Sequence, residues 1–218
     1  MFFETFYSRF TQANKIQFRI MTTKGAQSKA EHIDWKYIPL SIQKLELDKQ
    51  YKIALIVAFG SFFGIRLKSI LSLKWEDVLG KEAFELEYKN KLRNIYIIED
   101  IRNLTDRIHR KLESPDMEQF IFLNKSGQQV LSSQYINKQV KLLFTKYEIP
   151  YQNLSSDSFL KTFCIKYLET KDYTTEAKRW ISKILGHASW SITANFLGLS
   201  DDSPDKDNYE AFSMDLEF

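Results

Sequence analysis

The sequence predicts an α+β domain that is mainly α-helical and carries a small antiparallel sheet. Several segments after residue 38 place apolar residues three and four positions apart, which is the spacing of one helix face. Between residues 84 and 97, apolar and polar residues alternate on either side of a short polar stretch, which predicts one β-hairpin. Aromatic residues make up 15% of the chain, enough to build a core and to exclude disorder over its whole length.

The first expected helices follow Pro39. Ser41 is the expected N-cap of a helix over residues 42–48. A helix over residues 51–63 would carry apolar side chains on nearly every face, so a buried helix is predicted there, and Gly64 is expected to end it. Another helical face covers residues 66–73, and Trp75-Glu76-Asp77 is expected to end that helix. Trp75 is expected to belong to the core.

The hairpin is expected to pair residues 84–88 with residues 95–97 across a basic tip that spans Lys89–Arg93. A short strand is expected over residues 120–123, before a polar turn. Helices are expected over residues 101–112, 132–147, 159–168, 177–185 and 191–197.

Composition divides the chain into three segments. Residues 1–37 form an aromatic-rich appendage, in which the alternation of apolar residues over 16–20 suggests a short strand. Residues 38–200 form the helical domain, and residues 201–218 form an acidic tail. The tail holds seven acids and one base, a charge of −6, and leaves 30 bases against 21 acids, or +9, in residues 1–200. Such an asymmetry suggests a polyanionic partner for the basic body.

Several classes of protein are excluded by composition. The single cysteine, Cys164, cannot form an intramolecular disulfide or a multi-cysteine metal site, and the three histidines are scattered, so no metal or other cofactor is expected. The longest apolar run, 53–65, is shorter than the ~20 residues that a membrane helix needs. The first residues lack the basic region of a signal peptide. We therefore expect a cytoplasmic protein.

Four segments carry short motifs in a fixed order. Phe63–Arg66 is followed by Leu71-Ser72-Leu73-Lys74-Trp75-Glu76-Asp77, and Lys89 lies in the predicted hairpin. Residues 155–164 come next, and the last segment is Leu185-Gly186-His187-Ala188-Ser189 followed by Thr193 and Phe196. In order and spacing these segments resemble the catalytic domain of tyrosine recombinases, the phage-type integrases. The resemblance covers roughly residues 38–200 and implies that fold. We expect the family's separate helical core-binding domain to be absent or replaced by residues 1–37.

The resemblance also implies roles for particular residues. Arg66 stands at the first arginine of the family, whose planar fork matches two phosphate oxygens. Lys89 stands at the hairpin lysine, a general acid, and His187 at a hydrogen-bond donor. Phe196 follows His187 by nine residues, which is two and a half helical turns. On one straight helix the two side chains would face opposite ways, so a break near residues 188–191 is required, with Ser189 or Ser191 as the N-cap.

The departures from the family pattern decide the expected function. Phe196 stands where the family has its nucleophilic tyrosine and has no oxygen with which to attack phosphorus. Asp157 and Leu160 stand at the histidine and the second arginine of the family's H-x-x-R box. Lys161, one position further on, can supply charge but not the bidentate fork. Loss of one transition-state donor costs ~10²–10³ in rate, and loss of the nucleophile removes the reaction.

We therefore expect a catalytically inactive, tyrosine-recombinase-like protein that binds double-stranded DNA through backbone contacts. It would be an accessory or regulatory factor linked to a mobile element, associated with a bacterial nucleoid. The expected DNA-binding residues are Arg66, Lys68, Lys89, Lys91, Arg93, Lys161 and His187. One alternative is an active recombinase in which residue 196 has been altered or another nucleophile is used. A second is a protein-interaction module that has lost DNA binding.

Structural roles remain open for the same residues. Arg66 could cap a core helix, His187 could cap a helix C-terminus, and the hairpin bases could form a solvated tip. Phe196 is expected to pack inward. The acidic tail could dock on a second copy or on a recombinase partner, fold back over the basic cleft, or stay solvated.

Overall fold

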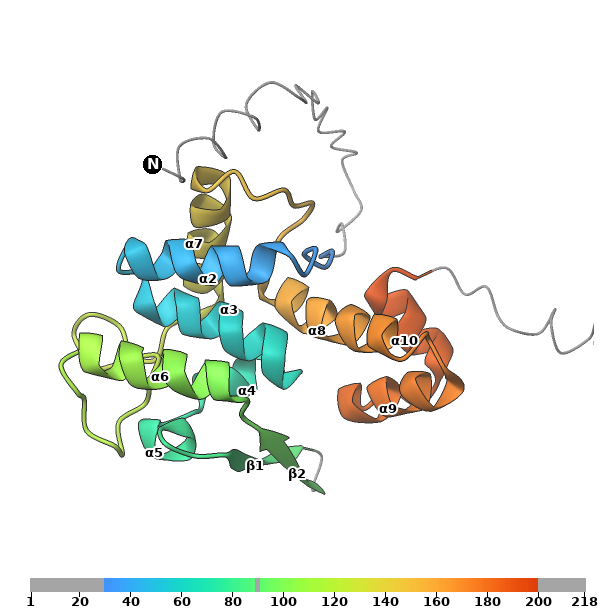
Figure 1. Cartoon of the computed structure of the whole chain (residues 1–218), viewed down its shortest axis with the longest axis horizontal. Helices are drawn as coiled ribbons and strands as arrows, with labels where there is room; N and C mark the ends of the chain where they lie inside the picture. The colour runs from blue at the N-terminus through green and yellow to red at the C-terminus, as the bar shows by residue number, and fades with distance from the viewer. Residues whose placement is uncertain (1–29, 89–90, 200–218) are drawn as a thin grey trace, which may run out of the picture.

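The computed structural model of the chain describes residues 30–88 and 91–199 (Figure 1). This part of the chain is mainly helical with a two-stranded antiparallel sheet, as predicted. Its elements are α2 (Tyr37–Leu47), α3 (Tyr51–Phe63), α4 (Leu67–Leu71), α5 (Trp75–Val78), β1 (Ala83–Tyr88), β2 (Lys91–Tyr96), α6 (Glu99–Lys111), α7 (Ser133–Lys146), α8 (Ser156–Thr170), α9 (Thr175–Leu185) and α10 (Trp190–Leu197).

Helix α3 forms the centre of the domain. Every residue from Ile53 to Ser61 is buried, because α2, α6, α7 and α8 pack around it. Phe59 stacks on Phe63 with ring centroids 4.7 Å apart and meets Phe122 edge-on. The all-apolar run therefore forms the buried helix that the sequence predicts, and each large side chain that it buries stabilises the fold by about 2–3 kcal/mol.

The core is divided into two clusters that meet along α8. The larger cluster includes α2, α3, α6 and α7 and ends at Phe159. The smaller cluster begins at the next residue, Leu160, and continues through Cys164 and Leu168 to α9 and α10. Figure 1 shows α9 and α10 together at one end of the molecule, joined to the rest through α8. Helix α8 thus fixes the position of the α9–α10 pair relative to α3.

The hairpin pairs β1 with β2 in the register Ala83↔Tyr96 through Tyr88↔Lys91. Residues 89 and 90, at its turn, lie outside the described residues. Phe84 is buried on the inner face and meets Phe63 edge-on, with ring centroids 5.3 Å apart. The hairpin is therefore attached to the C-terminal end of α3.

Three local predictions were wrong. Helix α2 begins at Tyr37 and tolerates Pro39 in its first turn, where the missing N–H has no helical partner. Ser41 is therefore buried inside the helix, and its hydroxyl donates to the Ile38 carbonyl at 2.7 Å. The expected strand at 120–123 is reduced to isolated bridges, one of which joins Phe120 to Lys74. The segment after residue 74 starts α5 rather than ending a helix, although Trp75 is buried as predicted.

The segment before α2 packs with the domain. Ile33 is buried in the larger cluster, its N–H donates to the Thr162 hydroxyl at 2.8 Å, and that hydroxyl lies 3.1 Å from the Ile33 carbonyl. The strand expected over 16–20 and the acidic tail at 201–218 lie outside the described residues. Within the described ranges, no helix has both the length and the apolar character required to cross a bilayer.

Candidate functional site

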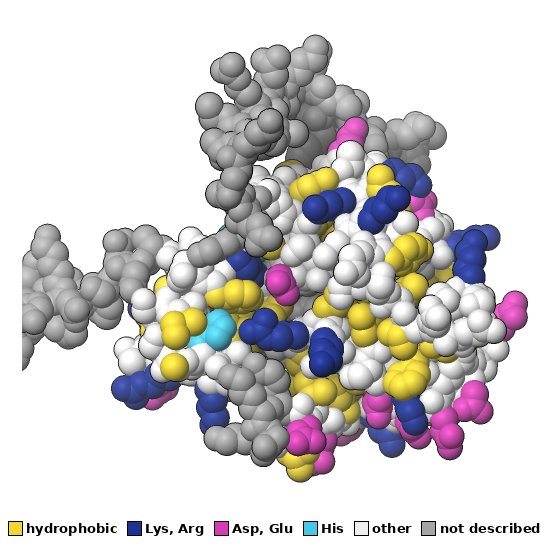
Figure 2. Space-filling model, turned by 180° about the vertical axis from the view of Figure 1, so that it is seen from behind, with side chains coloured by type: hydrophobic (Ala, Val, Ile, Leu, Met, Phe, Trp, Pro, Cys, Tyr) yellow, Lys and Arg dark blue, Asp and Glu magenta, His cyan; other side chains and the backbone are white. Residues whose placement is uncertain are grey.

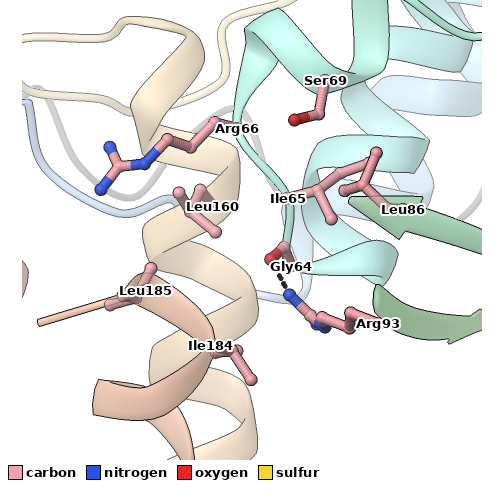
Figure 3. A pocket seen from close by; sticks show the side chains of 9 residues that line it. All are labelled: Gly64, Ile65, Arg66, Ser69, Leu86, Arg93, Leu160, Ile184 and Leu185. Carbon is pink, nitrogen blue, oxygen red and sulfur yellow. Dashed lines mark hydrogen bonds between the residues drawn. The ribbon is translucent and has the colours of Figure 1, made fainter. Parts of the chain in front are cut away.

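Arg66 is placed by the sharp end of α3. Gly64 closes that helix in the left-handed region, with φ 61°, which a residue with a side chain adopts only under strain. A Cβ at residue 64 would also lie 2.3 Å from the Phe163 ring of α8, so only glycine fits. Arg66 follows in extended backbone as the N-cap of α4. In Figure 3 its guanidinium extends past Leu160, on the side of the pocket that carries Leu185 of α9.

His187 is placed by the end of α9. Gly186 adopts φ 69°, and the His187 N–H donates to the Ser182 carbonyl at 2.9 Å, which closes the helix. The Nδ1 atom of His187 lies 3.1 Å from the Thr193 hydroxyl, and that hydroxyl lies 2.8 Å from the Ser182 hydroxyl. These contacts fix the orientation of the imidazole ring. Ser189 is the N-cap of α10, which confirms the predicted break between His187 and residue 196.

Phe196 lies between the basic residues of the site. The centroid of its ring is 5.9 Å from the Arg66 Cζ atom and 4.7 Å from the Lys161 Nζ atom. The His187 ring meets it edge-on, with centroids 5.5 Å apart. Phe196 is only partly buried and packs against the smaller cluster. The structure thus brings Arg66, Lys161 and His187 together around one aromatic ring, in contacts of the cation–π type for the first two.

Lys161 is the buried cation of this group. Only 3% of the residue is exposed, and its ammonium donates to the Ala30 carbonyl. Burial raises the pKa of the neighbouring Cys164 thiol to about 12, and Arg93, Arg66 and Lys161 act against that rise through their positive charge.

The residues at the H-x-x-R positions have no phosphate-binding chemistry. Leu160 is 1% exposed and forms an apolar wall of the pocket that Arg66 also lines. Asp157 is exposed in the first turn of α8, where its charge favours the helix N-terminus. The H-x-x-R segment therefore supplies packing and a helix start.

The structure describes the side chains of only some of the basic residues expected to bind DNA near the hairpin. Lys89 lies outside the described residues, and Lys91 is described only as part of the β2 backbone. Lys68 is exposed on α4, the helix that Arg66 begins. Arg93 pairs with Leu86 inside the hairpin, so its assignment to the tip was wrong.

Arg93 instead anchors the end of α3. Its Nη1 atom donates to the Gly64 carbonyl at 3.1 Å (Figure 3), and its Nη2 atom donates to the Phe63 carbonyl at 3.2 Å. Both are carbonyls that the ending helix leaves without a helical partner, and the guanidinium supplies the missing donors. Arg93 therefore holds the hairpin against the turn that positions Arg66.

Replacing Arg93 with glutamine is expected to lower the free energy of unfolding by about 2 kcal/mol, because charged hydrogen bonds to buried carbonyls are lost. Urea unfolding followed by circular dichroism measures the change. The control, Arg110→Gln, alters an exposed residue of α6 and should stay within ~0.5 kcal/mol of the unchanged chain. Equal effects of the two substitutions would show that Arg93 does not anchor the hairpin.

The sequence did not reveal the polar support behind His187. Ser182 and Thr193 are buried polar residues on the inner faces of α9 and α10. Thr193 belongs to the last motif, but Ser182 has no recognisable local signal. Only the packing of α9 against α10 brings the two hydroxyls together.

The fold and this arrangement define a domain of the tyrosine-recombinase catalytic type. Residues 40–202 match the sequence profile of the Phage integrase family. The chain therefore belongs to that family. No curated protein matches the sequence. Among the described residues, no cluster of His, Cys, Asp and Glu side chains could hold a metal ion.

Solved structures of recombinases have a similar fold. XerA recombinase has a TM-score of 0.61 at 18% identity, over 85% of this chain and 67% of that one. The Tn1549 transposon integrase in complex with transposon right end DNA has a TM-score of 0.61 at 15% identity, over 87% and 68%. XerH site-specific recombinase bound to difH substrate has a TM-score of 0.59 at 17% identity, over 85% of this chain and 54% of that one. At such identities the similarity shows the fold alone.

Proposed function

We propose that this protein binds the backbone of double-stranded DNA at the Arg66–Lys161–His187 site without cutting it, as an accessory or regulatory factor linked to a mobile element. The observation that carries the proposal is the position of Phe196, an oxygen-free side chain in contact with all three basic residues. The Tn1549 transposon integrase, which has a similar fold, is in complex with transposon right end DNA, and this supports a DNA ligand here.

Arg66 supports the binding half of the proposal. Its side chain forms no salt bridge with any residue in the described part of the chain, so its fork is available to a phosphate. Lys161 adds a buried positive charge behind the Phe196 ring, and His187 adds a hydrogen-bond donor in a fixed orientation. Buried charge acts strongly on a nearby anion because little water screens it.

The proposal that the protein does not cut DNA rests on the absence of the family's tyrosine and second arginine at residues 196 and 160. Phe196 cannot form a bond to phosphorus, and Leu160 cannot stabilise the charge that develops on the phosphate. Thr193 carries a hydroxyl 3.1 Å from the His187 Nδ1 atom, but it is fully buried and hydrogen-bonded to Ser182 and to the Ser189 carbonyl. A hydroxyl held in this way does not reach a phosphodiester, so it does not replace the tyrosine.

The expected result with a nicked DNA substrate that traps cleavage products is no covalent protein–DNA adduct. The unchanged chain should form none because Phe196 supplies no nucleophile, and Phe196→Tyr should form none because Leu160 stands at the position of the second arginine. Denaturing gels of each protein after incubation with the substrate measure the adduct. An adduct with the unchanged chain would overturn the proposal. An adduct with Phe196→Tyr alone would show that residue 196 is the only block.

The tail at 201–218 lies outside the described residues, so docking on a second copy or on a recombinase partner stays a prediction. A role on DNA agrees with the predicted nucleoid association.

A further inference from the structure

A second positively charged surface lies next to the site. Helix α9 and the start of α10 form a groove of about 540 Å³. It is lined by Lys178, Arg179, Lys183, His187, Ser189 and Trp190, among other residues, and no acid from the described part of the chain lines it. None of these residues except His187 was predicted to bind DNA from the sequence. We define Lys178, Arg179 and Lys183 as the α9 groove cations.

The α9 groove cations are not neutralised by the protein. None of the three forms a salt bridge with an acid in the described part of the chain. The Lys178 ammonium lies 5.4 Å from the centroid of the Trp190 ring, which holds that charge at the wall of the groove. Three like charges gathered in one hollow repel one another, and a bound polyanion would relieve that repulsion.

The groove is continuous with the candidate site through His187. That residue lines the groove and also contacts the Phe196 ring. Figure 2 shows a face on which Lys and Arg side chains gather near the centre, beside a His. More of them lie at the lower edge on the side of α9 and α10. One extended anion could therefore touch both surfaces.

We propose that the α9 groove holds the phosphates of the same DNA strand next to the one bound at Arg66 and His187. The inference rests on the proposed function and adds three residues to the DNA interface. Phosphodiester backbone is the class of ligand that fits, because the groove offers several separate positive charges and repeated phosphates supply several separate negative ones.

The test compares two triple variants of the full chain that change the charge equally. The groove variant carries Lys178→Gln, Arg179→Gln and Lys183→Gln. The control variant carries Arg110→Gln and Lys111→Gln, at the exposed end of α6, and Lys125→Gln, at an exposed turn before α7. Figure 1 shows α6 well apart from α9. Fluorescence anisotropy with a labelled duplex, repeated over a series of salt concentrations, gives the affinity and its salt dependence.

The groove variant should bind at least tenfold more weakly than the control variant at low salt. The slope of log affinity against log salt should become shallower by about 2 to 3, because each lost phosphate contact reduces it by about 1. Thermal unfolding that coincides for the two variants would exclude a folding defect as the cause.

Equal effects of the two variants would overturn the inference, while weak binding by Arg66→Gln in the same assay would keep the proposed function. The absence of DNA binding by the unchanged chain would overturn both. The inference would also be overturned if the groove variant bound DNA like the control variant but differed from the unchanged chain in the mass of its assembly, measured by sedimentation. The groove would then hold an acidic protein segment.

Discussion

Replacing Arg66 with glutamine is expected to weaken DNA binding by about ten- to a hundredfold. The guanidinium would donate charged hydrogen bonds to a phosphate, each worth about 1.5–3 kcal/mol, and glutamine removes both the charge and the fork. The slope of log affinity against log salt should also become shallower by about 1. Anisotropy titrations of the full chain with duplex DNA measure both quantities.

Two further substitutions make this result specific. Arg66→Lys keeps the charge but loses the bidentate geometry, so its affinity should lie between those of the unchanged chain and Arg66→Gln. Arg110→Gln removes an exposed charge from α6 and should leave the affinity nearly unchanged. Binding by Arg66→Gln at the level of Arg110→Gln would show that Arg66 only caps α4.

Replacing Gly64 with alanine is expected to lower the free energy of unfolding by about 3 kcal/mol. Positive φ costs an alanine about 1–2 kcal/mol, and a Cβ 2.3 Å from the Phe163 ring forces α8 or the ring to move, which costs a further 1–3 kcal/mol. Because α8 carries Lys161, that movement would also disturb the candidate site. Chemical unfolding of purified protein measures the change in stability.

Gly127→Ala is the matched control for that substitution. Gly127 also has positive φ, 72°, but a Cβ there would meet nothing within 4 Å. Gly127→Ala should therefore show only the conformational cost of about 1–2 kcal/mol. If the two substitutions destabilise the protein equally, the close packing of α3 on α8 at Gly64 does not constrain the fold as described.

Much of the fold follows from local patterns in the sequence. The all-apolar run 51–63 specified the central helix, because such a segment is stable only when surrounded on every side. Alternation over 84–88 specified the hairpin, and the spacing from His187 to Phe196 required the break that Ser189 caps. The error at Pro39 has a local cause, because α2 includes this residue in its first turn, where the missing N–H has no helical partner.

The candidate site was predictable in part. The positions of Arg66 and His187 followed from motifs that lie in loops at helix ends. The role of Arg93 was not predictable, because nothing local indicates that a hairpin arginine reaches the carbonyls at the end of α3. Lys161 was expected to be near the site, but its burial and its bond to Ala30 depend on the segment before α2. The α9 groove depends on how α9 meets α10.

A crystal structure of the full chain with duplex DNA tests the central claim most directly. The account predicts a backbone phosphate in contact with the Arg66 guanidinium and His187, with the Phe196 ring beside it and no bond between the protein and phosphorus. DNA bound elsewhere on the protein, with Arg66 and His187 away from every phosphate, would contradict it.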